Sequence, residues 1–104
     1  MESPVTAKAA LLQVLIRGPG YGLELIERVS KFTNGRLELG QGSVYPALRD
    51  LEREGFLKSY PGEATQDRGG RPRIMYKLTA EGRGAAMSHG ATVRALFNHL
   101  EPAT

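Results

Sequence analysis

The stretch Gly42-Ser43-Val44-Tyr45-Pro46-Ala47-Leu48-Arg49-Asp50-Leu51-Glu52-Arg53-Glu54-Gly55 has a helical pattern with a proline near its beginning and a glycine at its end. Proline lacks a backbone N–H, and its ring clashes with the carbonyl four residues earlier. Pro46 therefore predicts a helix that begins between Gln41 and Ser43, with residue 42 at or before the cap. Gly55 predicts where this helix ends.

One face of this helix is apolar, because Val44, Leu48 and Leu51 recur at helical spacing. Other side chains lie off this face: Ser43, Tyr45, Pro46, Arg49 and Arg53. A tyrosine and a proline on the outer side of the first turns indicate a contact surface.

Length and composition exclude several classes of protein. The chain has 104 residues, a net charge of +3 and no cysteine. This length predicts one domain, and the lack of cysteine excludes disulfides, thiolate metal sites and a cysteine nucleophile. The longest apolar run near the N-terminus is interrupted at Gln13 and is far below the ~20 residues of a membrane span. We expect a soluble cytoplasmic protein with no membrane partner.

The sequence predicts neither an enzyme nor a cofactor. It has no nucleophile beside a plausible base, no carboxylate pair and no phosphate-binding glycine loop followed by lysine. His89 and His99 are too far apart in sequence to form a metal-binding pair on one helical face. We predict no metal site in the chain, and only a site that spans a dimer stays open.

The elements follow a recognisable order. Helical patterns cover residues 5–17, 21–33 and the stretch quoted above, and strand patterns cover 56–60 and 73–79 with a turn-rich segment at 61–72. Thr79 is a suitable N-cap for a last helix over 80–100, and Glu81 in its first turn favours the helix dipole. This order predicts an α+β, mainly α, winged helix-turn-helix over 1–79 and a C-terminal dimerisation helix with its tail over 80–104, together one compact unit.

Basic residues concentrate near the expected tip of the hairpin. From residue 68 to residue 77 the chain has no acidic residue and four basic ones, namely Arg68, Arg71, Arg73 and Lys77. Glycine at 69 and 70 lets this segment adapt to a groove. The pattern indicates contact with phosphate, the alternative being a solvated charged loop.

Four motifs in this order resemble the PadR family of bacterial transcriptional regulators. They are Gly20-Tyr21-Gly22-Leu23-Glu24-Leu25-Ile26, the quoted stretch, Gly70-Arg71-Pro72-Arg73 and Tyr76-Lys77-Leu78-Thr79-Ala80-Glu81-Gly82-Arg83. The match covers about residues 9–83, and its most specific part is the Gly-x-x-Tyr-Pro-x-Leu-x-x-Leu-Glu core of the third helix. The resemblance implies a homodimeric winged-helix DNA binder, usually a repressor and often released by a small molecule.

Residue chemistry and this resemblance select the expected contacts with DNA. We expect the Tyr45 ring to lie outside the core, against sugar or a thymine methyl, and Arg49 to reach a guanine edge or a phosphate unless it pairs with a carboxylate of its own helix. Ser43 either caps the helix or donates to a phosphate, and Arg71 aligns with the Gly-Arg-Pro element of the family. The full set is Gln41, Ser43, Tyr45, Pro46, Arg49, Arg68, Arg71 and Arg73.

The last helix carries apolar residues at spacings of four and three, which is the pattern of a packing seam. Its members are Ala86, Gly90, Val93, Phe97 and Leu100. We expect this seam to form the interface of a homodimer, the alternative being a helix folded back on its own domain.

The expected function is that of a sequence-specific regulator of transcription. It would act as a homodimer on a pseudo-palindromic operator, as a repressor that a small-molecule effector releases. The alternative is a winged-helix module that binds a protein and not DNA. That module would present an acidic or apolar outer face on its third helix, whereas this chain presents Tyr45, Arg49 and Arg53.

Overall fold

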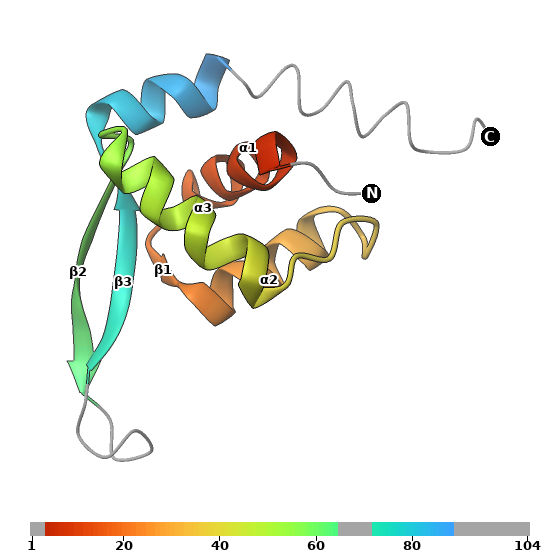
Figure 1. The fold of residues 1–104 in the computed structure, drawn as a ribbon, viewed down its shortest axis with the longest axis horizontal. Helices are drawn as coiled ribbons and strands as arrows, with labels where there is room; N and C mark the ends of the chain where they lie inside the picture. The colour runs from red at the N-terminus through yellow and green to blue at the C-terminus, as the bar shows by residue number, and fades with distance from the viewer. Residues whose placement is uncertain (1–3, 65–71, 89–104) are drawn as a thin grey trace.

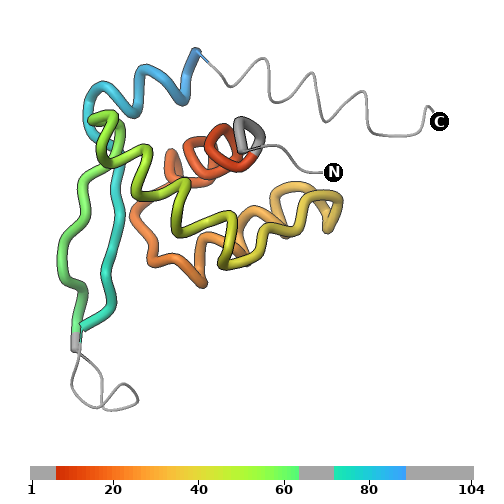
Figure 2. Tube along the Cα trace, viewed as in Figure 1, coloured from red at the N-terminus to blue at the C-terminus, as the bar shows by residue number. Residues whose placement is uncertain are grey.

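The fold is known from a computed structural model, which describes residues 4–64 and 72–88 (Figure 1). Its elements are α1 (Pro4–Leu15), β1 (Gly20–Tyr21), α2 (Gly22–Phe32), α3 (Gln41–Arg53), β2 (Leu57–Ala64), β3 (Pro72–Leu78) and a last helix over residues 80–88. The first three helices gather into one group, and the β2–β3 hairpin projects from its side (Figures 1 and 2). This arrangement confirms the winged helix-turn-helix architecture.

The hydrophobic core lies between α1, α2 and α3. Along α1 the buried positions run almost continuously from residue 10 to residue 15, as expected for a helix covered over much of its circumference. The largest fully buried side chains are Leu11, Leu15, Leu25, Val29, Val44, Leu48 and Leu51. The apolar face that the sequence predicts for α3 thus packs against α1 together with Leu25 and Val29 of α2.

Pro46 lies inside α3, which corrects the expectation that residue 42 stands at or before the cap. The N-cap is Gly40, and the helix begins at Gln41, so Gly42 is its second residue. Pro46 cannot donate to the carbonyl of Gly42, but Gly42 is exposed and its carbonyl can be hydrated. A proline is therefore tolerated two residues deeper in the helix than the sequence argument allowed.

The sheet has three strands in the order β1-β3-β2, all antiparallel. The hairpin was expected, but β1 was not, because two residues carry no strand pattern until β3 pairs with them. β1 aligns Tyr21 with Met75, and this pairing attaches the base of the hairpin to the start of α2. β2 continues to Ala64, four residues past the expected end, with an irregular register between Pro61 and Ala64 that accommodates the proline.

One joint connects α3, the hairpin and the helix over 80–88. Gly55 turns the chain out of α3 with a φ of 86°, in the left-handed region that favours glycine. The Thr79 hydroxyl donates to the Gly55 carbonyl at 2.6 Å and accepts the Gly82 N–H at 3.0 Å. Thr79 therefore caps the last helix, as predicted, and also holds it against the end of α3.

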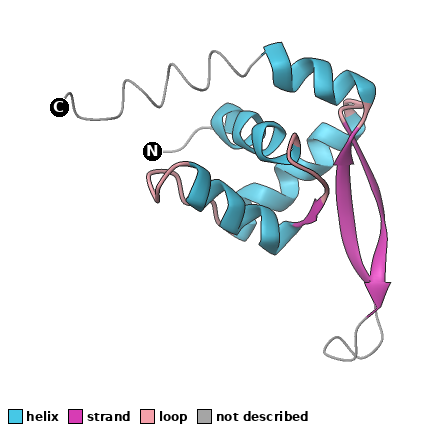
Figure 3. Ribbon diagram, turned by 180° about the vertical axis from the view of Figure 1, so that it is seen from behind, coloured by secondary structure: helices cyan, strands magenta, loops and turns pink. Residues whose placement is uncertain are grey.

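The last helix is anchored to α1 as well. Gln13 is buried in α1, and its Nε2 donates to the Ala86 carbonyl at 2.6 Å. The Ala86 side chain is fully buried within the domain. Ala86, the first residue of the predicted dimer seam, therefore packs on its own domain in the single chain. Figure 3 shows this helix from behind, beyond the end of the hairpin opposite its tip.

Candidate nucleic-acid interface

α3 separates a core side from an open side, as its sequence pattern predicted. Val44, Leu48 and Leu51 are buried at 1% exposure or less, and Ala47 joins them. Gln41, Pro46 and Arg49 are exposed. The helix therefore presents polar and cationic side chains away from the core.

Arg49 forms no ion pair with any part of the chain that the structure describes. The carboxylates nearby are held by other groups: Arg53 pairs with Asp50, and the Lys8 ammonium lies 3.0 Å from Glu54 Oε2. Glu52 accepts the Ser59 hydroxyl at 2.6 Å and so ties α3 to β2. The alternative of an intrahelical pair for Arg49 is thus not observed, and its guanidinium is exposed.

Tyr45 is half-buried, contrary to the expectation that it lies outside the core. Its ring packs on the edge of the core and against Gly22 at the start of α2. The close approach is possible only because residue 22 has no side chain. The sequence argument missed this contact because it considered α3 alone. Tyr45 still lines an open cleft, so its role is divided between packing and surface.

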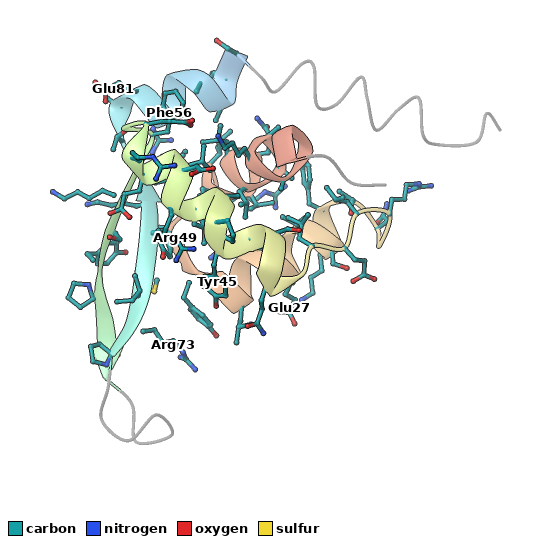
Figure 4. The ribbon with its side chains drawn as sticks, viewed as in Figure 1. Glu27, Tyr45, Arg49, Phe56, Arg73 and Glu81 are labelled. Carbon is teal, nitrogen blue, oxygen red and sulfur yellow. The ribbon has the colours of Figure 1, made fainter. Side chains whose placement is uncertain are left out.

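Among the basic residues of the hairpin that the structure describes, Arg73 lines the same cleft as Tyr45. Its Cζ lies 4.4 Å from the centre of the Tyr21 ring, which is a cation–π arrangement, and its Nε is buried without a hydrogen-bond partner. The cleft has a volume of about 330 Å³ and is lined by Tyr21, Gly22, Leu23, Tyr45, Arg73, Ile74 and Tyr76. Figure 4 shows Arg49, Tyr45 and Arg73 on the same side of α3, in the angle between that helix and the hairpin.

Tyr76 of β3 also lines this cleft. Burial raises the pKa of Tyr76 above its usual value of 10.0, and the charges of Glu52 and Tyr45 raise it further, while Arg49 lowers it. These causes place Tyr76 among groups from α3, and its cross-strand partner Ser59 binds Glu52. The base of the hairpin is therefore fixed to α3 by polar as well as apolar contacts.

Ser43 and Pro46 face a different side of α3. Together with Lys8 and Asp50 they line a cleft of about 200 Å³ between α3 and α1. Ser43 does not cap the helix, because the N-cap is Gly40 and no side chain bonds there. The structure thus brings together Tyr45, Arg49 and Arg73, and separates Ser43 from them.

Several predicted positions lie outside the described residues. These are the hairpin residues Arg68 and Arg71, the seam residues Gly90, Val93, Phe97 and Leu100, and the two histidines His89 and His99. Within the described ranges, no cluster of histidine, cysteine, aspartate and glutamate could hold a metal ion. None of the helices in those ranges has the length and apolar character needed to cross a membrane.

Comparison with known proteins identifies the family. Residues 11–88 match the model of the transcriptional regulator PadR-like family, so the chain belongs to that family. The fold is similar to a transcriptional regulator from Clostridium thermocellum, with 26% identity, a TM-score of 0.71 and coverage of 89% of this chain and 87% of that one. An uncharacterized protein of Lysinibacillus sphaericus is 25% identical over 73 residues, and the match spans 70% of this chain and 64% of that protein.

The fold is also shared with a protein that was solved on DNA. PadR of Bacillus subtilis, in complex with operator DNA, has a TM-score of 0.67 to this chain at 22% identity. The match covers 78% of this chain and 44% of that one. This similarity concerns the winged helix-turn-helix fold.

Proposed function

We propose that this chain is a sequence-specific DNA-binding regulator of transcription, in which α3 enters the major groove and the hairpin contacts the flanking backbone. The observation that carries the proposal is the placement of Arg49. The residue is exposed and forms no ion pair among the described residues, and it lies beside Tyr45 and on the same side as Arg73. Arginine in that position can donate two hydrogen bonds to a guanine or bind a phosphate.

The remaining features of the proposal come from the sequence and the family. Arg68 and Arg71 would extend the basic surface of the hairpin toward the DNA backbone. The chain would act as a homodimer through Gly90, Val93, Phe97 and Leu100, so that two copies of α3 meet a two-fold operator. We also propose that the chain represses transcription and that a small-molecule effector releases it from DNA.

The experiment begins with a duplex that the wild-type chain selects from a random-sequence library. Affinity for this duplex is then measured for Arg49→Ala and for the control Lys31→Ala. Lys31 is also a helical cation, but it lies near the far end of α2 and pairs with Glu27 at 3.7 Å. Arg49→Ala is expected to weaken binding by about tenfold or more, and Lys31→Ala by less than about twofold.

Two outcomes would reject the proposal. A wild-type chain that selects no duplex would favour the protein-binding module instead. Equal effects of the two alanine variants would show that binding follows total charge rather than the face of α3.

A further inference from the structure

Two large apolar side chains are exposed at the cleft between α2 and the hairpin. Leu23 is 50% exposed and Ile74 is 52% exposed, and neither belongs to the buried core. They come from distant parts of the chain, α2 and β3, and both line the cleft that contains Tyr45 and Arg73. Insertion of α3 into the major groove of DNA does not explain why these two apolar side chains are exposed.

The electrostatics of the same cleft favour an anion. No acidic side chain lines it, and its one charged lining residue is Arg73. The Tyr21 ring holds the guanidinium at 4.4 Å, and a buried Nε–H without a partner costs free energy until an acceptor reaches it. The first residues of α2, Gly22 and Leu23, form another part of the wall, where the helix dipole is positive.

Cationic and apolar surfaces side by side match the chemistry of a nucleic-acid backbone, in which each unit has one phosphate and one sugar. A phosphate is bound by an arginine held in place, and the carbon face of a deoxyribose packs on aliphatic side chains. We propose that this cleft seats one nucleotide unit of the DNA backbone, with its phosphate at Arg73 and its deoxyribose between Leu23 and Ile74. Tyr21 is then a positioning residue for Arg73.

The inference rests on the proposed DNA-binding function and defines where the hairpin would meet the backbone, in a cleft that α2, β3 and Tyr45 of α3 form together. The two parts of the proposed contact contribute to the binding free energy in different ways. The Arg73 contact contributes to the salt dependence of binding, because it replaces a counterion on the DNA. The contacts of Leu23 and Ile74 contribute affinity that salt does not change, because they involve no charge.

Serine variants test the apolar walls on the duplex selected by the wild-type chain. Leu23→Ser and Ile74→Ser are each expected to weaken binding by about three- to tenfold, with the slope of affinity against salt unchanged. The matched control is Phe32→Ser, which alters a 39% exposed apolar side chain at the other end of α2 and is expected to change affinity by less than about twofold. Circular dichroism confirms folding, and Ile74→Ser carries the test if Leu23→Ser does not fold.

Neutral methylphosphonates, placed one at a time in the duplex, test the phosphate. In the wild-type complex, substitution at the phosphate bound by Arg73 is expected to weaken binding by about fivefold or more. In Arg73→Gln the same substitution should have no further effect, and Arg73→Lys should retain part of it.

The outcomes distinguish this inference from the function on which it rests. If the wild-type chain binds its duplex while both serine variants keep full affinity, the cleft is not a backbone site. The inference is equally overturned if Arg73→Gln and the wild type respond alike at every methylphosphonate position. If the wild-type chain selects no duplex at all, the proposed function itself fails.

Discussion

Tyr45 and Gly22 are in direct contact, since a Cβ added at Gly22 would lie 2.6 Å from the Tyr45 hydroxyl oxygen. The glycine is buried at the beginning of α2, and the tyrosine comes from the second turn of α3. This pair sets how closely the two helices approach at the edge of the cleft. One side chain therefore both holds the helix-turn-helix together and forms part of its candidate DNA surface.

Gly22→Ala is expected to destabilise the fold by about 1–3 kcal/mol, because the added methyl group must displace the Tyr45 ring. Urea unfolding followed by circular dichroism measures the change. Gly84→Ala is the control, since Gly84 lies in the helix over 80–88 with no other atoms within 4 Å of an added Cβ. That variant should gain roughly 0.5–1 kcal/mol from helix propensity. Equal effects at the two positions would contradict the contact.

Tyr45→Phe and Tyr45→Ala separate packing from recognition. The phenylalanine retains the ring against Gly22, so stability should change by less than about 1 kcal/mol, while loss of the hydroxyl weakens DNA binding by about three- to tenfold. The alanine variant should lose about 2–4 kcal/mol of stability in addition. Affinity and unfolding are measured on the same preparations. If Tyr45→Phe binds as the wild type does, the hydroxyl makes no contact with DNA.

Gln13→Leu tests the link between α1 and the helix over 80–88. The substitution removes the buried hydrogen bond to the Ala86 carbonyl and is expected to cost about 1–3 kcal/mol in the free energy of unfolding. Arg17→Leu, an exposed change just after the same helix, should stay within about 0.5 kcal/mol of the wild type. A neutral effect of Gln13→Leu would mean that the link contributes nothing to stability.

Stability is expected to fall as the pH rises above about 10, because the pKa of Tyr76 is raised in the folded chain. The sign follows from proton binding: at such pH the unfolded chain has already released the Tyr76 proton, while the folded chain still holds it. The contribution is therefore complete below the unfolded pKa and is lost as the pH approaches and passes the folded pKa. Urea midpoints between about pH 8 and 11 measure this fall. Tyr76→Phe should show a shallower fall, and an unchanged slope would argue against the burial of this hydroxyl.

Phe97→Asp is expected to give monomers, since a charge placed in an apolar seam opposes association. Sedimentation velocity measures the oligomeric state, and Phe97→Leu is the control that keeps the seam apolar. An intact dimer in Phe97→Asp would place the interface elsewhere in the chain.

Much of the fold could be predicted because its signals are local. The range expected for the start of α3, Gln41 to Ser43, includes its first residue Gln41, and the N-cap role of Thr79 follows from its place before a helical pattern. The apolar face of α3 was predicted from spacing alone, and Val44, Leu48 and Leu51 are buried as expected. These features depend on neighbours within a few residues.

The features that sequence reasoning missed depend on contacts between distant segments. β1 exists because β3 pairs with it, and Tyr45 is half-buried because Gly22 admits its ring. Ala86 matched a seam by its spacing, yet the last helix turns that position toward α1, where Gln13 binds its carbonyl. The sequence could not show that Leu23 and Ile74 are exposed at one cleft, because an exposed aliphatic residue is unremarkable until its neighbours in space are known.

The joint at Gly55 and Thr79 sets the distance between α3 and the hairpin as well as the angle between them. α3 ends there, the hairpin starts there, and Thr79 binds the Gly55 carbonyl across it. If α3 reads bases while the hairpin meets the backbone, this joint sets how many base pairs separate the two contacts. A change at Gly55 would then alter the spacing of the preferred site while the bases that α3 prefers stay the same. The joint would then set the spacing of the two contacts without contacting DNA itself.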